Sequence, residues 1–205
     1  TRALGNTFAA LTQKIREDDP LLSLKVALAR FSKNSRFPND TEFKEALIHG
    51  DLYESRNCRF VLDRLENDSK EQIDTSDFTI EHVMPQNPNL NTDWRKMLGG
   101  DWKVTQETWL HRLGNLTLTG YNSEYQDKAF ASKKTMKGGF DNSPLRLNKD
   151  MRDSDDWNVA AMDKRSKRLA RIALKLWPKL EVNEQAVAAA VLAEKQAQAS
   201  GLSVD

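Results

Sequence analysis

Apolar side chains recur at intervals of three and four residues over both ends of this chain, and this periodicity constrains the fold most. Near the amino-terminal end the series comprises Phe8, Leu11, Ile15, Leu22 and Val26. Near the carboxyl end it comprises Trp157, Ala161, Leu169, Ile172, Leu176 and Trp177, and it stops at Pro178. Such spacing places apolar groups on one face of an α-helix, and proline cannot continue a helix. The sequence therefore predicts a mainly α fold.

Further helices are expected after the turn at Phe37–Asp40. Asp40 or Thr41 can cap a helix that carries Phe43, Ala46 and Leu47. A longer helix should follow, with an apolar stripe formed by Tyr53, Cys58, Val61, Leu62 and Leu65. The alanine-rich segment 183–199 is either a docked helix or a frayed tail. The polar run 66–77 is the best candidate boundary, so we expect a helical subdomain over 1–70, a core over 71–150, a closing helix over 151–180 and a helix or tail over 181–205.

The middle of the chain has a different pattern. Asp77–Pro85 alternates β-branched or aromatic residues with polar ones, which predicts a short strand that ends in a loop. A short helix is expected around 94–98, and a second strand between Gly114 and Gly120. Ser123 and Gln126 have the spacing of a capping box, so a helix should run from there towards Met136. The predicted local order is strand, strand, helix.

Composition excludes several classes of protein. No apolar run approaches the roughly 20 residues that a bilayer span needs, so we expect no membrane protein. The first residues lack the apolar core of a secretory signal, and a chain that opens at Thr1 is expected to be a piece of a longer protein. A single cysteine, Cys58, excludes a disulfide framework and an all-cysteine zinc site. It is best interpreted as a core thiol in a cytoplasmic protein.

The formal net charge of +1 hides two basic blocks. Lysine and arginine dominate residues 128–149 and 164–179, whereas residues 77–127 lean acidic. Nucleic-acid-binding domains usually carry a clear positive excess, so the overall charge argues against this class and the two blocks argue for it. A lysine-rich helix face is more often simply solvated, and this pattern is weak support for a polyanionic partner.

Four polar side chains around the two predicted strands suggest a metal site. Glu81 offers an anionic oxygen, His82 an imidazole, and Asn115 and Asn122 amide oxygens. A divalent ion can clamp a scissile phosphate while a histidine takes a proton from the attacking water. Neighbouring residues point to opposite faces of a strand, so this scheme requires a bend at Glu81–His82. Taken singly, each residue has a more usual explanation: His82 as a hydrogen-bonded histidine, Asn115 as a turn residue and Asn122 as part of a helix cap.

The same residues, in order, resemble a known family. The segments that carry the resemblance are Ile80–Asn87 and Leu113–Leu118, followed by Asn122, Phe130 and Lys133. The helical stretch before them and the final helix resemble it too, over about residues 37–178. This succession resembles the carboxy-terminal nuclease domain of GmrSD-type modification-dependent restriction enzymes, which also occurs in SspE-like phage-defence proteins.

The resemblance implies an HNH nuclease, with a small ββα-metal insert in the mainly α fold. It implies that His82 is the general base, that Asn115 is catalytic through bracing the histidine loop, and that Asn122 contributes to catalysis as a metal ligand. Glu81 lies where such folds place an acidic ligand. Oxygen ligands favour Mg²⁺, with Mn²⁺ second. The interval from His82 to Asn115 is long for the motif, and His111 within it could approach the metal, although packing is the simpler interpretation.

Several basic residues are candidate contacts to DNA phosphates. We expect these to be Lys128, Lys133, Lys134, Arg146 and Arg165. Lys133 is the strongest candidate because it falls in the family motif. For Arg165, an ion pair that fastens the last helix is an equal alternative.

The sequence thus predicts a metal-dependent endonuclease that nicks double-stranded DNA, including phage or modified DNA, in a restriction or anti-phage protein. Relatives pair such a domain with an amino-terminal nucleotide-hydrolysing half, and this chain has no phosphate-binding loop of its own. The alternative is a noncatalytic helical module that binds DNA or protein and keeps the motif as scaffold.

Overall fold

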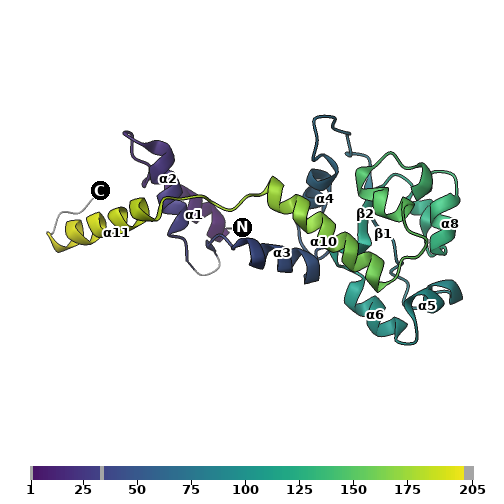
Figure 1. The fold of residues 1–205 in the computed structure, drawn as a ribbon. Helices are drawn as coiled ribbons and strands as arrows, with labels where there is room; N and C mark the ends of the chain where they lie inside the picture. Colours follow the sequence, from purple (N-terminus) through teal and green to yellow (C-terminus); the bar gives the residue numbers. More distant parts are fainter. Residues whose placement is uncertain (1, 33–34, 201–205) are drawn as a thin grey trace. The chain divides into compact units, whose positions relative to one another are not determined.

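The structure is a computed structural model that describes residues 2–32 and 35–200 (Figure 1). It is mostly helical and contains one two-stranded antiparallel sheet among the described residues. Contacts divide the chain into two compact units, residues 1–39 with 178–205 and residues 40–177. Each unit is described by itself below.

The smaller unit contains α1 (Arg2–Thr12), α2 (Pro20–Ala29) and α11 (Glu184–Ala199). Asp19 caps α2 because its side-chain oxygen accepts the backbone N–H of Leu22 at 3.1 Å, and Pro20 occupies the first turn, where a missing N–H costs nothing. Helix α11 contacts α2. The alanine-rich segment is therefore a helix and not a frayed tail.

The larger unit is a set of short helices around a hairpin. Its α-helices are α3 (Asp40–His49), α4 (Cys58–Glu66), α5 (Thr92–Leu98), α6 (Trp102–Trp109), α7 (Asn122–Tyr125), α8 (Phe130–Thr135), α9 (Lys149–Arg152) and α10 (Val159–Leu176). Single 3₁₀ turns are η2 (Leu113–Asn115), η3 (Phe140–Asn142) and η4 (Arg146–Asn148). The strands are β1 (Thr79–His82) and β2 (Leu116–Thr119). The hairpin lies between α4 and α8 in Figure 1.

The strand register decides which residues reach which core. Ile80 pairs with Leu118 and His82 with Leu116, whereas Thr79 pairs with Thr119 and Glu81 with Thr117. Cross-strand partners share a face of a sheet. One face of the hairpin therefore carries the leucines of β2, and the other carries threonines and Glu81.

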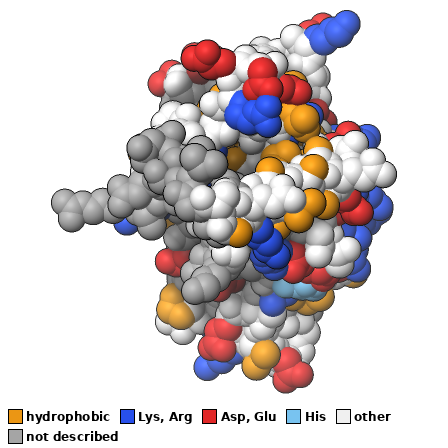
Figure 2. Space-filling view, turned by 90° about the vertical axis from the view of Figure 1, so that its left-hand side faces the viewer, with side chains coloured by type: hydrophobic (Ala, Val, Ile, Leu, Met, Phe, Trp, Pro, Cys, Tyr) orange, Lys and Arg blue, Asp and Glu red, His pale blue; other side chains and the backbone are white. Residues whose placement is uncertain are grey.

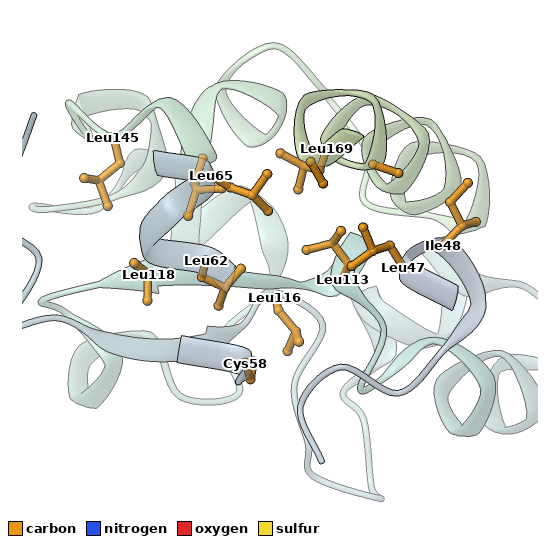
Figure 3. Close-up of a cluster of buried hydrophobic side chains, with 13 residues drawn as sticks. Leu47, Ile48, Cys58, Leu62, Leu65, Leu113, Leu116, Leu118, Leu145 and Leu169 are labelled. Atoms are coloured by element: carbon orange, nitrogen blue, oxygen red, sulfur yellow. The ribbon is translucent and has the colours of Figure 1, made fainter. Parts of the chain in front are cut away.

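A leucine-rich core covers the first of these faces. Leu62 and Leu65 of α4 and Leu169 of α10 gather with residues of η2 and β2 (Figure 3). Leu62 and Leu113 are fully buried, and burial of a leucine stabilises a fold by roughly 1.5–3 kcal/mol. This cluster holds the hairpin against α4 and α10. Cys58 lies in the same cluster as a free thiol, as the sequence predicts.

A second core is aromatic and holds α8 in place. The ring of Phe130 stacks on Trp157 at 5.5 Å between centroids and lies 6.2 Å from Trp94. Met84, two residues after the end of β1, is buried in the same cluster. The loop that follows β1 is thereby packed, which fixes the end of the strand.

Two predicted helices differ from the observed ones. The helix expected to run from Ser123 to Met136 is interrupted, because Gln126 adopts a left-handed φ of 43° between α7 and α8. Tyr53 lies outside α4, which begins at Cys58. The reason is that the Tyr53 N–H donates to the carbonyl of His111 at 3.1 Å, while Asp51 forms an isolated bridge with Arg112. That pairing holds this segment, which continues in bends and turns, against the chain before η2.

The polar run 66–77 is not where the contacts divide the chain. Side chains fasten it to α4: the Asn67 oxygen accepts the Ile73 N–H at 2.7 Å, and the guanidinium of Arg59 donates to the carbonyls of Thr75 and Phe78. Hydrogen bonds to polar side chains thus make this run part of the larger unit, although its composition is typical of a linker.

Candidate functional site

Strand β1 presents Glu81 and His82 to opposite faces of the hairpin. The ladder stays regular through His82, and the Val83 N–H donates to the carbonyl of Asn115 at 3.0 Å. The bend that the proposed metal site would require at this pair is therefore absent. The carboxylate and the imidazole can act on one group only where it lies against the edge of β1.

His82 is packed against two other rings. Its Nε2 lies 3.2 Å from Nδ1 of His111, and the Tyr53 ring meets it edge-on with centroids 4.5 Å apart. Only 4% of His82 is exposed. Burial, followed by the neighbouring His111 and Lys133, lowers the pKa of His82 to about 3. The imidazole is consequently neutral at physiological pH, which is the form that accepts a proton.

Glu81 forms a buried ion pair with Lys133 of α8. The Lys133 Nζ donates to the Glu81 Oε1 at 2.6 Å, to the carbonyl of Val83 at 3.1 Å and to that of His82 at 3.2 Å. Burial raises the pKa of Glu81 to about 7 and lowers the pKa of Lys133, and in each case the partner's charge opposes the shift. The lysine therefore balances the charge of the Glu81 carboxylate and also holds the end of β1 in place.

Asn115 fastens the loop after His82 to the start of β2. Its Oδ1 accepts the Met84 N–H at 2.7 Å, and its Nδ2 donates to the carbonyls of Met84 and Leu110 at 3.1 and 3.0 Å. The indole of Trp157 also donates to the Oδ1, at 3.3 Å. A fully buried amide with these partners is fixed in orientation, and so is the backbone on both sides of it.

Asn122, the first residue of α7, is attached to β1 by its amide nitrogen. Nδ2 donates to the carbonyl of Ile80 at 2.9 Å and to the Thr79 Oγ1 at 3.2 Å. Backbone groups alternate in direction along a strand, so the carbonyls of Ile80 and His82 share one edge. Asn122 takes the first of these carbonyls and Lys133 the second. The two side chains thus flank Glu81 along the edge of β1 that β2 does not occupy.

A surface hollow opens beside Asn122. It is lined by Asp77, Thr79, Gly120, Asn122 and Ser123. The half-buried Asn122 is therefore reached from solvent through an oxygen-rich surface, which the sequence pattern does not single out.

The donor set suits a hard divalent cation. Within the described residues, the Asn122 Oδ1 and the Glu81 Oε2 accept no hydrogen bond, which leaves a carboxylate and an amide oxygen next to one strand edge. The described part of the chain holds no group of three or more His, Cys, Asp and Glu side chains fit for a metal. Mg²⁺ needs no such cage, because it is commonly held by one or two carboxylates with water and phosphate oxygens.

Two of the predicted DNA contacts are not available to DNA in this structure. Lys133 is fully buried in the pair with Glu81. Arg165 is also fully buried: its guanidinium donates to the carbonyls of Leu113 and Leu147, at 2.8 and 3.1 Å, and its Nε lies 3.5 Å from the Asp150 carboxylate. These contacts match the alternative weighed for Arg165, in which it fastens the last helix to the body.

The other three predicted contacts lie nearer the surface. Lys134 donates to the carbonyls of Arg152 and Ser154 at 3.1 and 2.7 Å, and its side chain is 14% exposed. Arg146 is exposed and bonds the polar run at Ser69 and the carbonyl of Glu71. Lys128 is exposed and bonds the carbonyl of Glu124. Of the five, Lys128 and Arg146 remain in reach of a phosphate.

Part of the basic block 164–179 forms a stripe on α10. Lys164, Arg168, Arg171 and Lys175 follow at steps of four, three and four residues, which places them on one side of a helix. Arg168 is engaged with Asp150, whereas Lys164, Arg171 and Lys175 are exposed and have no ion-pair partner among the described residues. On the face drawn in Figure 2, described basic and acidic side chains are intermixed.

The pair formed by His111 and Tyr53 was missed. Nothing in the spacing of Tyr53, His82 and His111 signals their contact, because it depends on the bridge between Asp51 and Arg112.

In the described part of the chain, no helix is both long and apolar enough to cross a membrane.

One of three comparisons with known proteins gives a match. Residues 37–172 match the family model of the GmrSD restriction endonucleases, C-terminal domain. No curated protein and no solved structure matches the chain. The matched range holds both strands, Asn115, Asn122, α8 and most of α10. Since this match covers well over half of the sequence, the chain belongs to the family of GmrSD restriction endonuclease C-terminal domains.

Proposed function

We propose that this chain is a metal-dependent HNH endonuclease domain that nicks double-stranded DNA, with His82 as the general base. The observation that carries the proposal is the attachment of Asn122 to the carbonyl of Ile80. It ties the first residue of a following helix to β1 beside Glu81, in the order strand, strand, helix of a ββα-metal unit. The family match supports the same interpretation, since its members are restriction endonucleases.

In this proposal each residue has one task. Glu81 and Asn122 hold the cation, which when bound neutralises charge on the scissile phosphate. Asn115 keeps the loop after His82 in place. His82 takes a proton from water while the water oxygen bonds to phosphorus and the bond to the leaving oxygen breaks. That oxygen takes a proton from solvent, and His82 later returns its own proton to solvent.

Access to His82 requires a movement. The ring is 4% exposed, and its neighbour Tyr53 is 36% exposed and lies in the short segment between α3 and α4. We expect bound DNA to displace the Tyr53 ring, because this ring is the more exposed of the two aromatic neighbours. Lys128, Arg146 and the stripe on α10 supply charges for the DNA backbone.

Beyond this chain, we expect a cytoplasmic restriction or anti-phage protein in which a nucleotide-hydrolysing amino-terminal half accompanies this domain. Phage or modified DNA is then the substrate. Mg²⁺ is the expected ion and Mn²⁺ the second candidate, because both donors are oxygens.

Plasmid nicking by the purified chain tests the proposal. Supercoiled DNA is incubated with Mg²⁺ or Mn²⁺, and a parallel reaction contains EDTA. His82→Ala should lower nicking by roughly a hundredfold or more, the usual contribution of a general base. Asn122→Ala should lower it too, and more Mg²⁺ should recover part of the loss. His49→Ala is the matched control, because His49 is exposed and paired only with Glu45.

One observation favours the noncatalytic alternative. Glu81 is already compensated by Lys133, and His82 is covered, as expected of side chains that only support a fold. A chain that binds DNA with unchanged affinity after His82→Ala, and never nicks it with either ion, would be this scaffold module. Nicking that EDTA abolishes and His82→Ala removes excludes it.

A further inference from the structure

The two imidazoles of His82 and His111 meet through nitrogen atoms. His82 Nε2 lies 3.2 Å from His111 Nδ1, with ring planes 78° apart. Each neutral imidazole has one N–H and one lone pair, so one of these two nitrogens donates and the other accepts. The direction of this hydrogen bond decides which nitrogen of His82 carries its proton.

Only one direction leaves His82 able to act as a base. If His111 donated, the Nε2 lone pair of His82 would be used to accept that hydrogen bond. The proton of His82 would then lie on Nδ1, and His82 would have no free lone pair. If His82 donates from Nε2, its Nδ1 keeps a lone pair. We propose that His111 is a positioning residue that accepts the Nε2–H of His82 at its own Nδ1 and so holds His82 in the tautomer that can take a proton from water. This inference rests on the proposed function.

The surroundings fix His111 for this task. The Tyr53 ring stacks on it, with centroids 5.2 Å apart and planes 12° from parallel. The Tyr53 N–H donates to the His111 carbonyl at 3.1 Å, and the next residue, Arg112, bridges to Asp51. The backbone of His111 is thus held by the segment 51–53, and its ring is stacked on Tyr53 until DNA displaces that ring.

With His111 neutral, the same contact also gives the protonated state of the reaction an acceptor. When His82 has taken the proton, its Nε2–H becomes a charged donor, and hydrogen bonds of charged donors are about twice as strong as neutral ones. His111 then stabilises the imidazolium without touching water, phosphate or ion. Its role is to orient and stabilise His82, as the third member of a catalytic triad does for its histidine.

Two substitutions separate the hydrogen bond from the packing. His111→Phe keeps a ring for Tyr53 to stack on and removes the acceptor, whereas His111→Gln keeps an acceptor of similar reach. We expect kcat for plasmid nicking to fall about tenfold or more in His111→Phe with KM nearly unchanged, and His111→Gln to recover much of it. His49→Phe serves as the control, and thermal unfolding checks that each variant is folded.

A second readout does not depend on cleavage. Long-range ¹⁵N–¹H NMR correlations of the intact, metal-free chain report the tautomer of each histidine. We expect His82 in the wild type to carry its proton on Nε2, and His111→Phe to give averaged ring shifts. A proton on Nδ1 of His82 in the wild type overturns the inference, and so does an unchanged kcat in folded His111→Phe. If the wild type never nicks DNA, the proposed function fails, while the NMR result still decides the tautomer.

Discussion

Lys133 and Glu81 form a salt bridge of 2.6 Å in which the lysine side chain has no exposed surface and the glutamate side chain 5%. The pair joins α8 to β1, because the lysine also donates to the carbonyls of His82 and Val83. A lysine expected to contact DNA is thus an internal part of the site, and its removal has consequences for the fold.

Lys133→Met should destabilise the domain by about 3 kcal/mol or more, because it leaves a buried carboxylate without a partner. Urea unfolding followed by circular dichroism measures this loss. The double variant Lys133→Met with Glu81→Gln should recover part of it, since no buried charge remains. Lys128→Met on the neighbouring surface is the control, and equal losses in Lys128→Met and Lys133→Met would contradict the prediction.

Arg165→Met should act on stability and leave the DNA charge contacts unchanged. The variant removes the guanidinium donor from the carbonyls of Leu113 and Leu147 and leaves Asp150 with one arginine partner fewer. We expect a loss of about 2–4 kcal/mol in the free energy of unfolding. The salt dependence of DNA binding, measured well below the melting temperature, should stay as in the wild type. A reduced salt slope with unchanged stability would restore Arg165 as a DNA contact.

Arg171→Ala combined with Lys175→Ala should change the salt dependence of DNA binding and leave stability unchanged. Both residues are exposed on α10 and have no ion-pair partner among the described residues, so their removal should leave the melting temperature nearly unchanged. If the stripe meets phosphates, the slope of log K against log salt should fall by about two, because each basic residue that no longer binds a phosphate lowers it by close to one. Fluorescence anisotropy at several salt concentrations gives this slope. Lys14→Ala with Lys70→Ala, equal in charge and elsewhere on the surface, should not change it.

Tyr53→Ala should expose His82 to reagents. Diethylpyrocarbonate modifies neutral imidazoles that it can reach, and His82 is 4% exposed beneath the Tyr53 ring. Mass spectrometry should show slow modification of His82 in the wild type and a rate at least several-fold higher in the variant. The exposed His49 provides an internal standard, since its rate should be equal in both proteins. An unchanged His82 rate would mean that Tyr53 does not control access.

Cys58 should make stability fall at alkaline pH. Burial raises the pKa of its thiol to about 11, from about 9 in the unfolded chain. Its stabilising contribution is therefore complete below pH 9 and is lost as the pH rises towards 11, because the unfolded chain loses this proton first. The difference in unfolding free energy between wild type and Cys58→Ala should shrink by about 2 kcal/mol over this range. Parallel curves for the two proteins would show that the thiol does not titrate in this way.

Local patterns predicted much of the fold. The alternation at 77–85 and the glycines around 114–120 indicated both strands, and the helix before Gly99 ends there with the glycine at a φ of 88°. The break at Gln126 and the position of Tyr53 outside α4 had no local signal. Each depends on pairing with distant segments, which composition and periodicity do not record.

The candidate site was predictable as a set of residues and not as a set of contacts. The order of Glu81, His82, Asn115 and Asn122 indicated residues that the fold does bring around the hairpin. Lysine and arginine are usually exposed, so sequence reasoning assigned Lys133 and Arg165 to the surface. Only the structure shows that carbonyl groups and carboxylates hold both of them inside.

The free edge of β1 has a consequence for solubility. An unpaired strand edge is a template on which a second chain can add a strand, and this is a common route to aggregation. Here the carbonyls of Ile80 and His82 are already occupied by Asn122 and Lys133. Asn122 and Lys133 therefore also protect the sheet from self-association, and variants at these two positions are the ones to watch for precipitation during purification.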